Sequence, residues 1–246
     1  MRIIISPAKK MNVDVDTLAW QDLPQFLPQA QELLTLLQQM TYEELKKLWC
    51  CNDKLALLNY NRLKNMDLTE HLTPAILSYE GIQYQHMAPG VFTYDEYDYI
   101  QKHLRILSGF YGILKPFDGV TPYRLEMQAR LSVNEKSNLY DFWGDRLTKH
   151  LESETNIILN LASYEYSKII SKHLSPHTQM ITCTFGEWKN GKIIEKGTLC
   201  KMARGEMVRF MAENKIKKPE EIKTFQRLSF QFQPEFSNDA KYVFIR

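Results

Sequence analysis

The segment spanning residues 104–131 constrains the fold more than any other part of the chain. Its glycines and prolines recur too closely for one continuous helix or one long strand: Gly109, Gly112, Pro116, Gly119 and Pro122. Basic and aromatic side chains are interleaved with these breaks, and such side chains beside exposed backbone N–H groups are typical of a surface that contacts phosphates. A well-packed turn between core elements is the alternative. Because loops carry functional residues disproportionately often, we expect a functional segment here.

Around this segment, short apolar runs alternate with amphipathic stretches. Strands are predicted at 2–5, 156–161, 180–188, 192–197, 228–232 and 242–245, with Asn190-Gly191 marking a hairpin. Helices are predicted at 27–40, 41–49, 53–66, 73–78, 94–104, 139–151, 164–173, 200–213 and 219–224. Thr41 and Glu44 have capping-box spacing, and Asp53 can cap the next helix. The pattern predicts one mixed α/β (α+β) domain over residues 1–246, with a helix-rich N-terminal half around a mixed sheet.

Composition limits the classes of partner. The chain has 246 residues, 44% of them hydrophobic, and a formal net charge of +2, so nucleic-acid binding would need local clusters of positive charge. No apolar run approaches the roughly 18 residues that a membrane span requires, and the N-terminal run is too short for a signal peptide. We therefore expect a cytoplasmic protein without membrane contact. Its four cysteines, of which Cys50 and Cys51 are adjacent, are expected to be free thiols.

Two further basic clusters flank glycine or proline. Lys9 and Lys10 follow the first predicted strand, at the end where ligands bind in α/β proteins, although a solvated strand exit would look the same. In the second cluster, Lys201 and Arg204 share one face of a predicted helix, and Arg209 lies one position off that face. A glycine inside a helix costs about 1 kcal/mol relative to alanine, so Gly205 is expected to serve close packing or close approach by a ligand.

Recognised catalytic and metal-binding patterns are absent from the sequence. There is no GxSxG, GxGxxG or Walker A motif. His173 and His177 are separated by Pro176 and lack further ligands at useful spacing, which favours surface histidines over a zinc site. No metal, cofactor or catalytic residue is therefore assigned. Glu126 and Glu165 lie within glycine-rich and aromatic stretches, where ordinary ion pairs or a general acid and base are both open interpretations.

Residues 104–112 are comparable to the hairpin of a helix-hairpin-helix element. In such elements a glycine-containing turn between two helices offers backbone N–H groups to phosphates without reading bases. Here a helix would run into Gly109 and Gly112, although Pro116 permits only a very short second helix. The expectation is a phosphate contact through the backbone of residues 109–112.

Several longer pieces together resemble the YaaA-type peroxide stress protein family of bacteria. They are SPAKKM from Ser6, RILSGFYGILKPFDGVTPYRLEM from Arg105, LYDFWGDRLTKHL from Leu139, LASYEYSK from Leu161 and CKMARGEMVRF from Cys200. The resemblance implies a cytoplasmic protein that limits oxidative damage and free iron during hydrogen peroxide stress. It also implies sequence-tolerant binding of double-stranded DNA through a basic cleft and a helix-hairpin-helix-like element, with no cofactor and no obligate protein partner.

The resulting hypothesis is a DNA-binding stress protein with one basic cleft. The residues expected to contact DNA or its phosphates are Lys9, Lys10, Arg105, Gly109, Tyr111, Gly112, Lys115, Tyr123, Arg124, Lys201, Arg204 and Arg209. The alternative is an enzyme acting on a nucleotide or a nucleic-acid base, with Glu126 or Glu165 as acid or base and the arginines holding phosphate. A protein-interaction or iron-handling role without DNA contact is the third class.

Overall fold

A computed structural model describes residues 1–246 and confirms the mixed α/β fold. The strands of the main sheet are β1 (Arg2–Ile5), β5 (Leu104–Ser108), β6 (Gly112–Leu114), β8 (Ile157–Leu161), β9 (Gln179–Lys189), β10 (Lys192–Ile194), β11 (Gln231–Phe232) and β12 (Lys241–Ile245). Their order is β11-β12-β9-β8-β1-β5-β6, with β10 beside β9. The five inner strands from β12 to β5 run parallel, and β6, β10 and β11 pair antiparallel with their neighbours.

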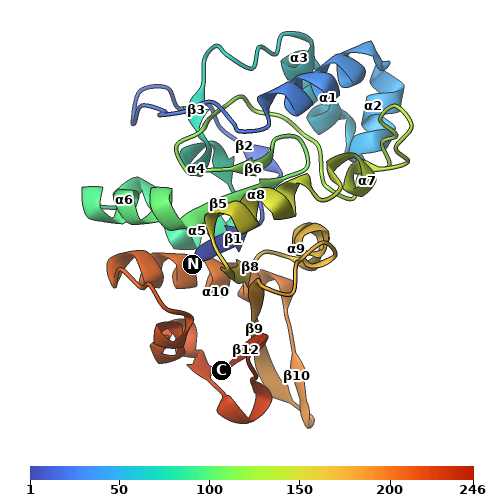
Figure 1. The fold of residues 1–246 in the computed structure, drawn as a ribbon. Coiled ribbons are helices and arrows are strands. Elements are labelled where there is room, and N and C mark those ends of the chain that lie inside the picture. The colour runs from blue at the N-terminus through green and yellow to red at the C-terminus, as the bar shows by residue number, and fades with distance from the viewer.

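Helices gather at one end of the molecule and lie along the sheet. Helices α1 (Leu27–Gln39), α2 (Tyr42–Trp49) and α3 (Asp53–Lys64) gather at one end, and β9, β10 and β12 form the other (Figure 1). The remaining helices are α4 (Ala75–Ser78), α5 (Ile82–Met87), α6 (Tyr94–His103), α7 (Leu139–Trp143), α8 (Arg146–Glu154), α9 (Tyr164–Ser171) and α10 (Gly197–Glu213). Two short strand pairs complete the fold: β2 (Lys10–Met11) with β4 (Tyr79–Glu80), and β3 (Thr73–Pro74) with β7 (Gly119–Val120). None of these helices combines the length and the apolar character that crossing a bilayer requires.

Strand β1 is the place where the connections of the sheet reverse direction. The chain passes from β1 to its neighbour β5 on one side and later returns to β8 on the other side. Ile3, Ile4 and Ile5 are completely buried, as expected for a parallel strand covered on both faces. In open α/β sheets, the crevice beyond the carboxyl ends of two strands connected in opposite directions is where ligands bind. The fold therefore predicts a ligand site among the residues that follow β1 and β8.

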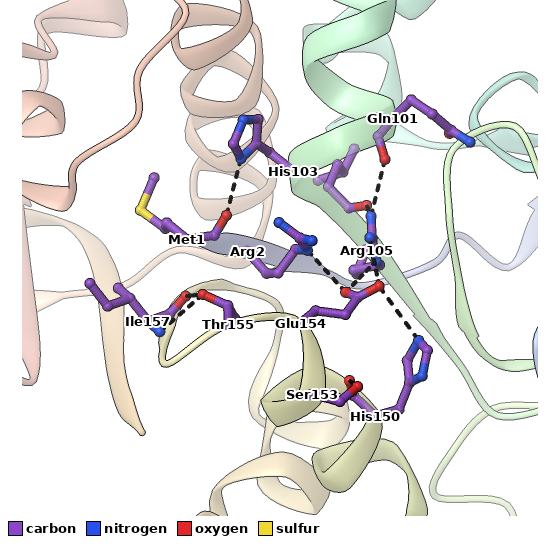
Figure 2. A network of polar contacts seen from close by, with 11 residues as sticks. Met1, Arg2, Gln101, His103, Arg105, His150, Ser153, Glu154, Thr155 and Ile157 are labelled. Atoms are coloured by element: carbon purple, nitrogen blue, oxygen red, sulfur yellow. Dashed lines mark hydrogen bonds and ion pairs between the residues drawn. The ribbon is translucent and has the colours of Figure 1, made fainter. Parts of the chain in front are cut away.

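A network of charged residues ties β1 and β5 to the end of α8. Arg2 on β1 and Arg105 on β5 both donate hydrogen bonds to the carboxylate of Glu154 (Figure 2). Arg105 is 3% exposed, and its guanidinium also donates to the backbone oxygens of Gln101 and Leu104. Burial alone would raise the pKa of Glu154, but the hydrogen bonds and charges of the two arginines lower it. Arg105 is therefore satisfied inside the protein.

Most predicted elements are confirmed, with changes at their ends. The capping box of Thr41 and Glu44 is present, but Asn52, and not Asp53, caps α3 by accepting a hydrogen bond from the Leu55 backbone N–H. The predicted helix at 139–151 is two helices, because Gly144 at φ 54° ends α7. The predicted helix at 73–78 begins as strand β3, the segment 219–224 is a 3₁₀ helix, and the predicted strand at 228–232 is reduced to β11.

The expected helix-hairpin-helix element is wrong for residues 104–112. Residues 104–108 form the buried strand β5, and residues 109–111 turn the chain into β6, so a hairpin of strands replaces one of helices. Gly109 is required because a Cβ there would lie 2.7 Å from the Leu125 backbone oxygen and 2.9 Å from the Met127 nitrogen. Gly112 has φ +75°, and a Cβ there would strike Trp143 and Leu147. The glycines serve internal packing, and the turn is buried away from any partner.

Candidate functional site

A pocket of about 390 Å³ lies beyond the carboxyl ends of β1 and β8. The turn after β1, the segment from β4 into α5, residues 123–126, the start of α9 and one face of α10 line it. Ser6 after β1 and Ser163 after β8 join the two strand ends, since the Ser6 hydroxyl accepts a hydrogen bond from the Ser163 backbone N–H at 2.8 Å. This is the crevice that the reversal at β1 predicts.

Lys9 and Lys10 lie at the mouth of the pocket. Their side chains are 65% and 68% exposed, and they form ion pairs with Glu126 and Glu80. Exposed ion pairs of this kind contribute only about 0–1 kcal/mol, so an incoming anion can replace the carboxylates at little cost. The two lysines therefore form a positively charged rim.

Arg124 and Tyr123 line the wall formed by residues 123–126. Gly109 packs against the backbone of residues 125–127 and fixes the position of this wall. The Arg124 side chain is 10% exposed and lies 3.8 Å from Glu126. The Tyr123 hydroxyl is buried and forms hydrogen bonds with Ser108 and Tyr79. The wall thus places a largely buried guanidinium on a rigid support.

Helix α10 supplies the opposite wall. Lys201 and Arg204 lie on one face and both line the pocket, as their spacing predicts. Gly205 packs this helix onto α5: a Cβ there would clash with the backbone oxygen of Gln83 and would lie 2.9 Å from the Met87 nitrogen. Of the two roles considered for Gly205, close packing is the one that the structure supports.

Arg204 is an unpaired charge in a largely desolvated position. Its Nε atom is buried without a hydrogen-bond partner, and its guanidinium forms no ion pair. Glu195 is the only carboxylate whose charge acts on it appreciably, and the two residues form no ion pair. Burial lowers the pKa of Arg204. Glu126 pairs with Lys9 and Arg124, so it does not neutralise Arg204.

Two other donors of the pocket share this condition. The Gln83 side-chain nitrogen and the Arg124 Nε atom are also buried without partners, and Gln83 is 6% exposed. A buried donor without an acceptor costs about 1–3 kcal/mol, and more when it is charged. Three such donors in one pocket are the signature of a site whose acceptor is an anionic or oxygen-rich ligand.

Glu165 is the titratable acid of the pocket. It lies in the first turn of α9, and one carboxylate oxygen accepts a long hydrogen bond of 3.3 Å from the Gln128 backbone N–H. Burial raises its pKa, and the nearby charge of Glu126 adds to that effect. Glu165 forms no ion pair. Glu165 and Arg204 thus line one pocket, and a carboxyl group of raised pKa in a pocket is a candidate for proton exchange with a ligand.

The structure does not bring every predicted contact residue to this pocket. Arg105 pairs with Glu154, and Arg209 pairs with Glu213. Lys115, on the connection from β6 to β7, pairs with Asp22. Residues Gly109, Tyr111 and Gly112 lie in the core. The pocket gathers six of the predicted set, namely Lys9, Lys10, Tyr123, Arg124, Lys201 and Arg204.

Several pocket residues escaped the sequence analysis. Ser6 and Ser163 follow predicted strands, so the rule about strand ends could have identified both. Gln83 and Tyr84 belong to the short helix α5, where no motif or spacing distinguishes them. They enter the pocket only because Gly205 lets α10 approach α5.

Comparisons with known proteins agree over nearly the full length. The family model described as peroxide stress protein YaaA matches residues 1–236. The UPF0246 protein DSY0297 of Desulfitobacterium hafniense is 56% identical over 246 residues, which cover all of this chain and 98% of that protein. UPF0246 proteins of Agathobacter rectalis and Lachnoclostridium phytofermentans are 54% and 55% identical, again over all of this chain and over 99% and 96% of their own lengths.

Removal of the unpaired charge at Arg204 should not destabilise the protein. In Arg204→Met, a desolvated cation without a partner is replaced by an apolar chain, so we expect the free energy of unfolding to stay equal or to rise by about 1–2 kcal/mol. If the pocket binds phosphate, phosphate should raise the melting temperature of the wild type by stabilising the folded state, and should do so far less in the variant. Thermal denaturation with and without phosphate checks both points. A variant that melts much earlier than the wild type would identify Arg204 as a structural residue.

Proposed function

This chain belongs to the YaaA peroxide stress protein family, and we propose that it serves the peroxide response by binding double-stranded DNA, with phosphate groups of the DNA held in the pocket between β1, β8 and α10. The observation that carries the proposal is the set of unpartnered buried donors on Gln83, Arg124 and Arg204. A phosphate group offers several strong acceptor oxygens, and arginine contacts two of them at once. Contacts to phosphate carry no sequence information, so binding through these donors would tolerate different base sequences.

The rim extends the proposed contact beyond the pocket. Lys9, Lys10 and Lys201 are exposed around its mouth, where the backbone of a longer nucleic acid would pass. Each neutralised phosphate releases counterions, so binding should weaken as salt increases. Arg124 and Arg204, which are more deeply placed, would hold one phosphate in a fixed position.

Two arginines on α10 provide a matched test of DNA binding. Arg204 is unpaired in the pocket, and Arg209 is paired with Glu213 outside it. Arg204→Lys should weaken binding about tenfold, because lysine cannot reproduce the two-point contact of a guanidinium, whereas Arg209→Lys should bind as the wild type does. Fluorescence titrations against duplex, single-stranded and branched DNA at two salt concentrations measure this. Equal losses in both variants, or an affinity that salt does not change, would contradict the proposal.

We propose that the part of this chain in limiting free iron is indirect and does not involve iron bound by the chain itself. No group of three or more histidine, cysteine, aspartate or glutamate side chains is placed to hold a metal ion. Metal analysis of protein purified without an affinity tag from peroxide-treated cells should therefore find iron far below one ion per chain. Stoichiometric iron would instead support direct storage.

A second candidate function is an enzyme acting on a nucleotide or a nucleic-acid base. It is favoured by Glu165, an unpaired carboxyl group of raised pKa in the same pocket as the unpaired Arg204. In that function the arginines and lysines would hold phosphate, and Glu165 would give or take a proton at the reacting group. Glu126 is the poorer candidate because Lys9 and Arg124 already pair with it.

The variant Glu165→Gln distinguishes the enzyme hypothesis from the DNA-binding hypothesis. The amide keeps the shape of the side chain but cannot exchange a proton at neutral pH, so turnover should fall by about 10²–10⁴-fold while phosphate binding is retained. Mass spectrometry of nucleotides and of short DNA incubated with the wild type and the variant measures the products. If the wild type forms no product, or if the variant forms it equally fast, Glu165 has no catalytic role.

A further inference from the structure

A second hollow of about 700 Å³ adjoins the pocket. The end of α1, one side of α2 and residues 124–130 form it. Arg124 and Glu126 line both cavities, so these two side chains form the wall between them. Glu126 is held in that wall by Lys9, at 2.9 Å, and by Arg124, at 3.8 Å. The two cavities are therefore neighbours separated by one pair of side chains.

The second hollow also contains a donor without an acceptor. Trp49 is 4% exposed, lines the hollow and has its indole N–H buried without a hydrogen-bond partner. Buried indole N–H groups usually have a hydrogen-bond partner, because a buried donor without an acceptor costs about 1–3 kcal/mol. The second cavity therefore holds one buried donor without an acceptor, as the first pocket holds three.

The charges of the second hollow favour an anion. Lys47 and Arg130 line it, are exposed and form no ion pair with any carboxylate. Glu44, the nearest acid on α2, is engaged in the capping box of that helix, where it accepts hydrogen bonds from Thr41. Glu126 is likewise neutralised by its own partners. Two unpaired cations therefore face whatever enters the hollow, and the Trp49 indole N–H lies buried in its wall.

From this arrangement we infer that the second hollow is a subsite for the next nucleotide of the strand whose phosphate occupies the first pocket. Lys47 and Arg130 hold its phosphate, and the Trp49 indole N–H donates to an oxygen of the sugar or base. The inference rests on the proposed function and names its ligand more closely. Two adjacent cavities with a side-chain wall between them suit consecutive unpaired nucleotides, as at a strand end or a branch of double-stranded DNA, because a base-paired strand would have to bring its partner with it.

Short oligonucleotides distinguish one subsite from two. Calorimetric titration with thymidine 5′-monophosphate probes the first pocket, and the 5′-phosphorylated thymidine dinucleotide probes both. The wild type should bind the dinucleotide on the order of tenfold more tightly, as expected for added charge-assisted contacts. The double variant Lys47→Gln with Arg130→Gln should lose this gain and keep its affinity for the monophosphate. Lys102→Gln, at an exposed unpaired lysine on α6 outside both cavities, should change neither affinity.

Trp49→Phe tests the indole donor without removing the ring. Because the donor is unpartnered in the free protein, the variant should melt no earlier than the wild type, yet it should bind the dinucleotide several-fold more weakly. Equal affinity of the wild type for both probes would overturn the second subsite and leave the first pocket standing. Failure of the wild type to bind either probe would overturn the proposed function together with the inference.

Discussion

The buried charge of Arg105 is the constraint around which the sheet is organised. A guanidinium inside a parallel sheet requires a carboxylate, and Glu154 supplies it from the last turn of α8 while also receiving Arg2 from β1. This single carboxylate therefore joins two adjacent strands to one helix (Figure 2). Loss of one partner of such a buried pair costs about 3–5 kcal/mol, because the other charge stays buried. The strand end that positions Ser6 and Lys9 thus depends on an interaction at the opposite end of β1.

Local sequence patterns predict the helices and strands, but not the contacts between residues that are distant in the sequence. Alternating periods, capping residues and the Asn-Gly turn predict most helices and strands, because each is a short-range signal. The sequence predicts Arg105 as a DNA contact because nothing within its segment points to Glu154, which lies 49 residues away. It predicts phosphate contacts at Gly109 and Gly112 for a similar reason, since the backbone and side chains that these glycines accommodate belong to residues 125–127, 143 and 147.

About half of the candidate site can be predicted from the sequence, because local rules identify single residues but not their convergence. Lys9 and Lys10 follow a strand, and Lys201 and Arg204 share a helix face, so two rules of local geometry identify them. Their convergence on one pocket depends on the position of β1 beside β8 and on the contact of α10 with α5. The rest of the site could not be predicted from the sequence. Gln83 is an example, because only the assembled fold leaves its side-chain nitrogen without an acceptor.

The wall formed by Arg124 and Glu126 has a thermodynamic consequence. Because the same two charges face both cavities, an anion on one side changes the electrostatic potential felt on the other. Occupancy of the two cavities is therefore linked, and the linkage is reciprocal: whatever factor the first ligand applies to the affinity of the second, the second applies to the first. Because both ligands are anions, a free nucleotide in one cavity weakens binding of a second in the other. Two nucleotides joined in one strand enter together, so the protein would favour a connected strand over free nucleotides.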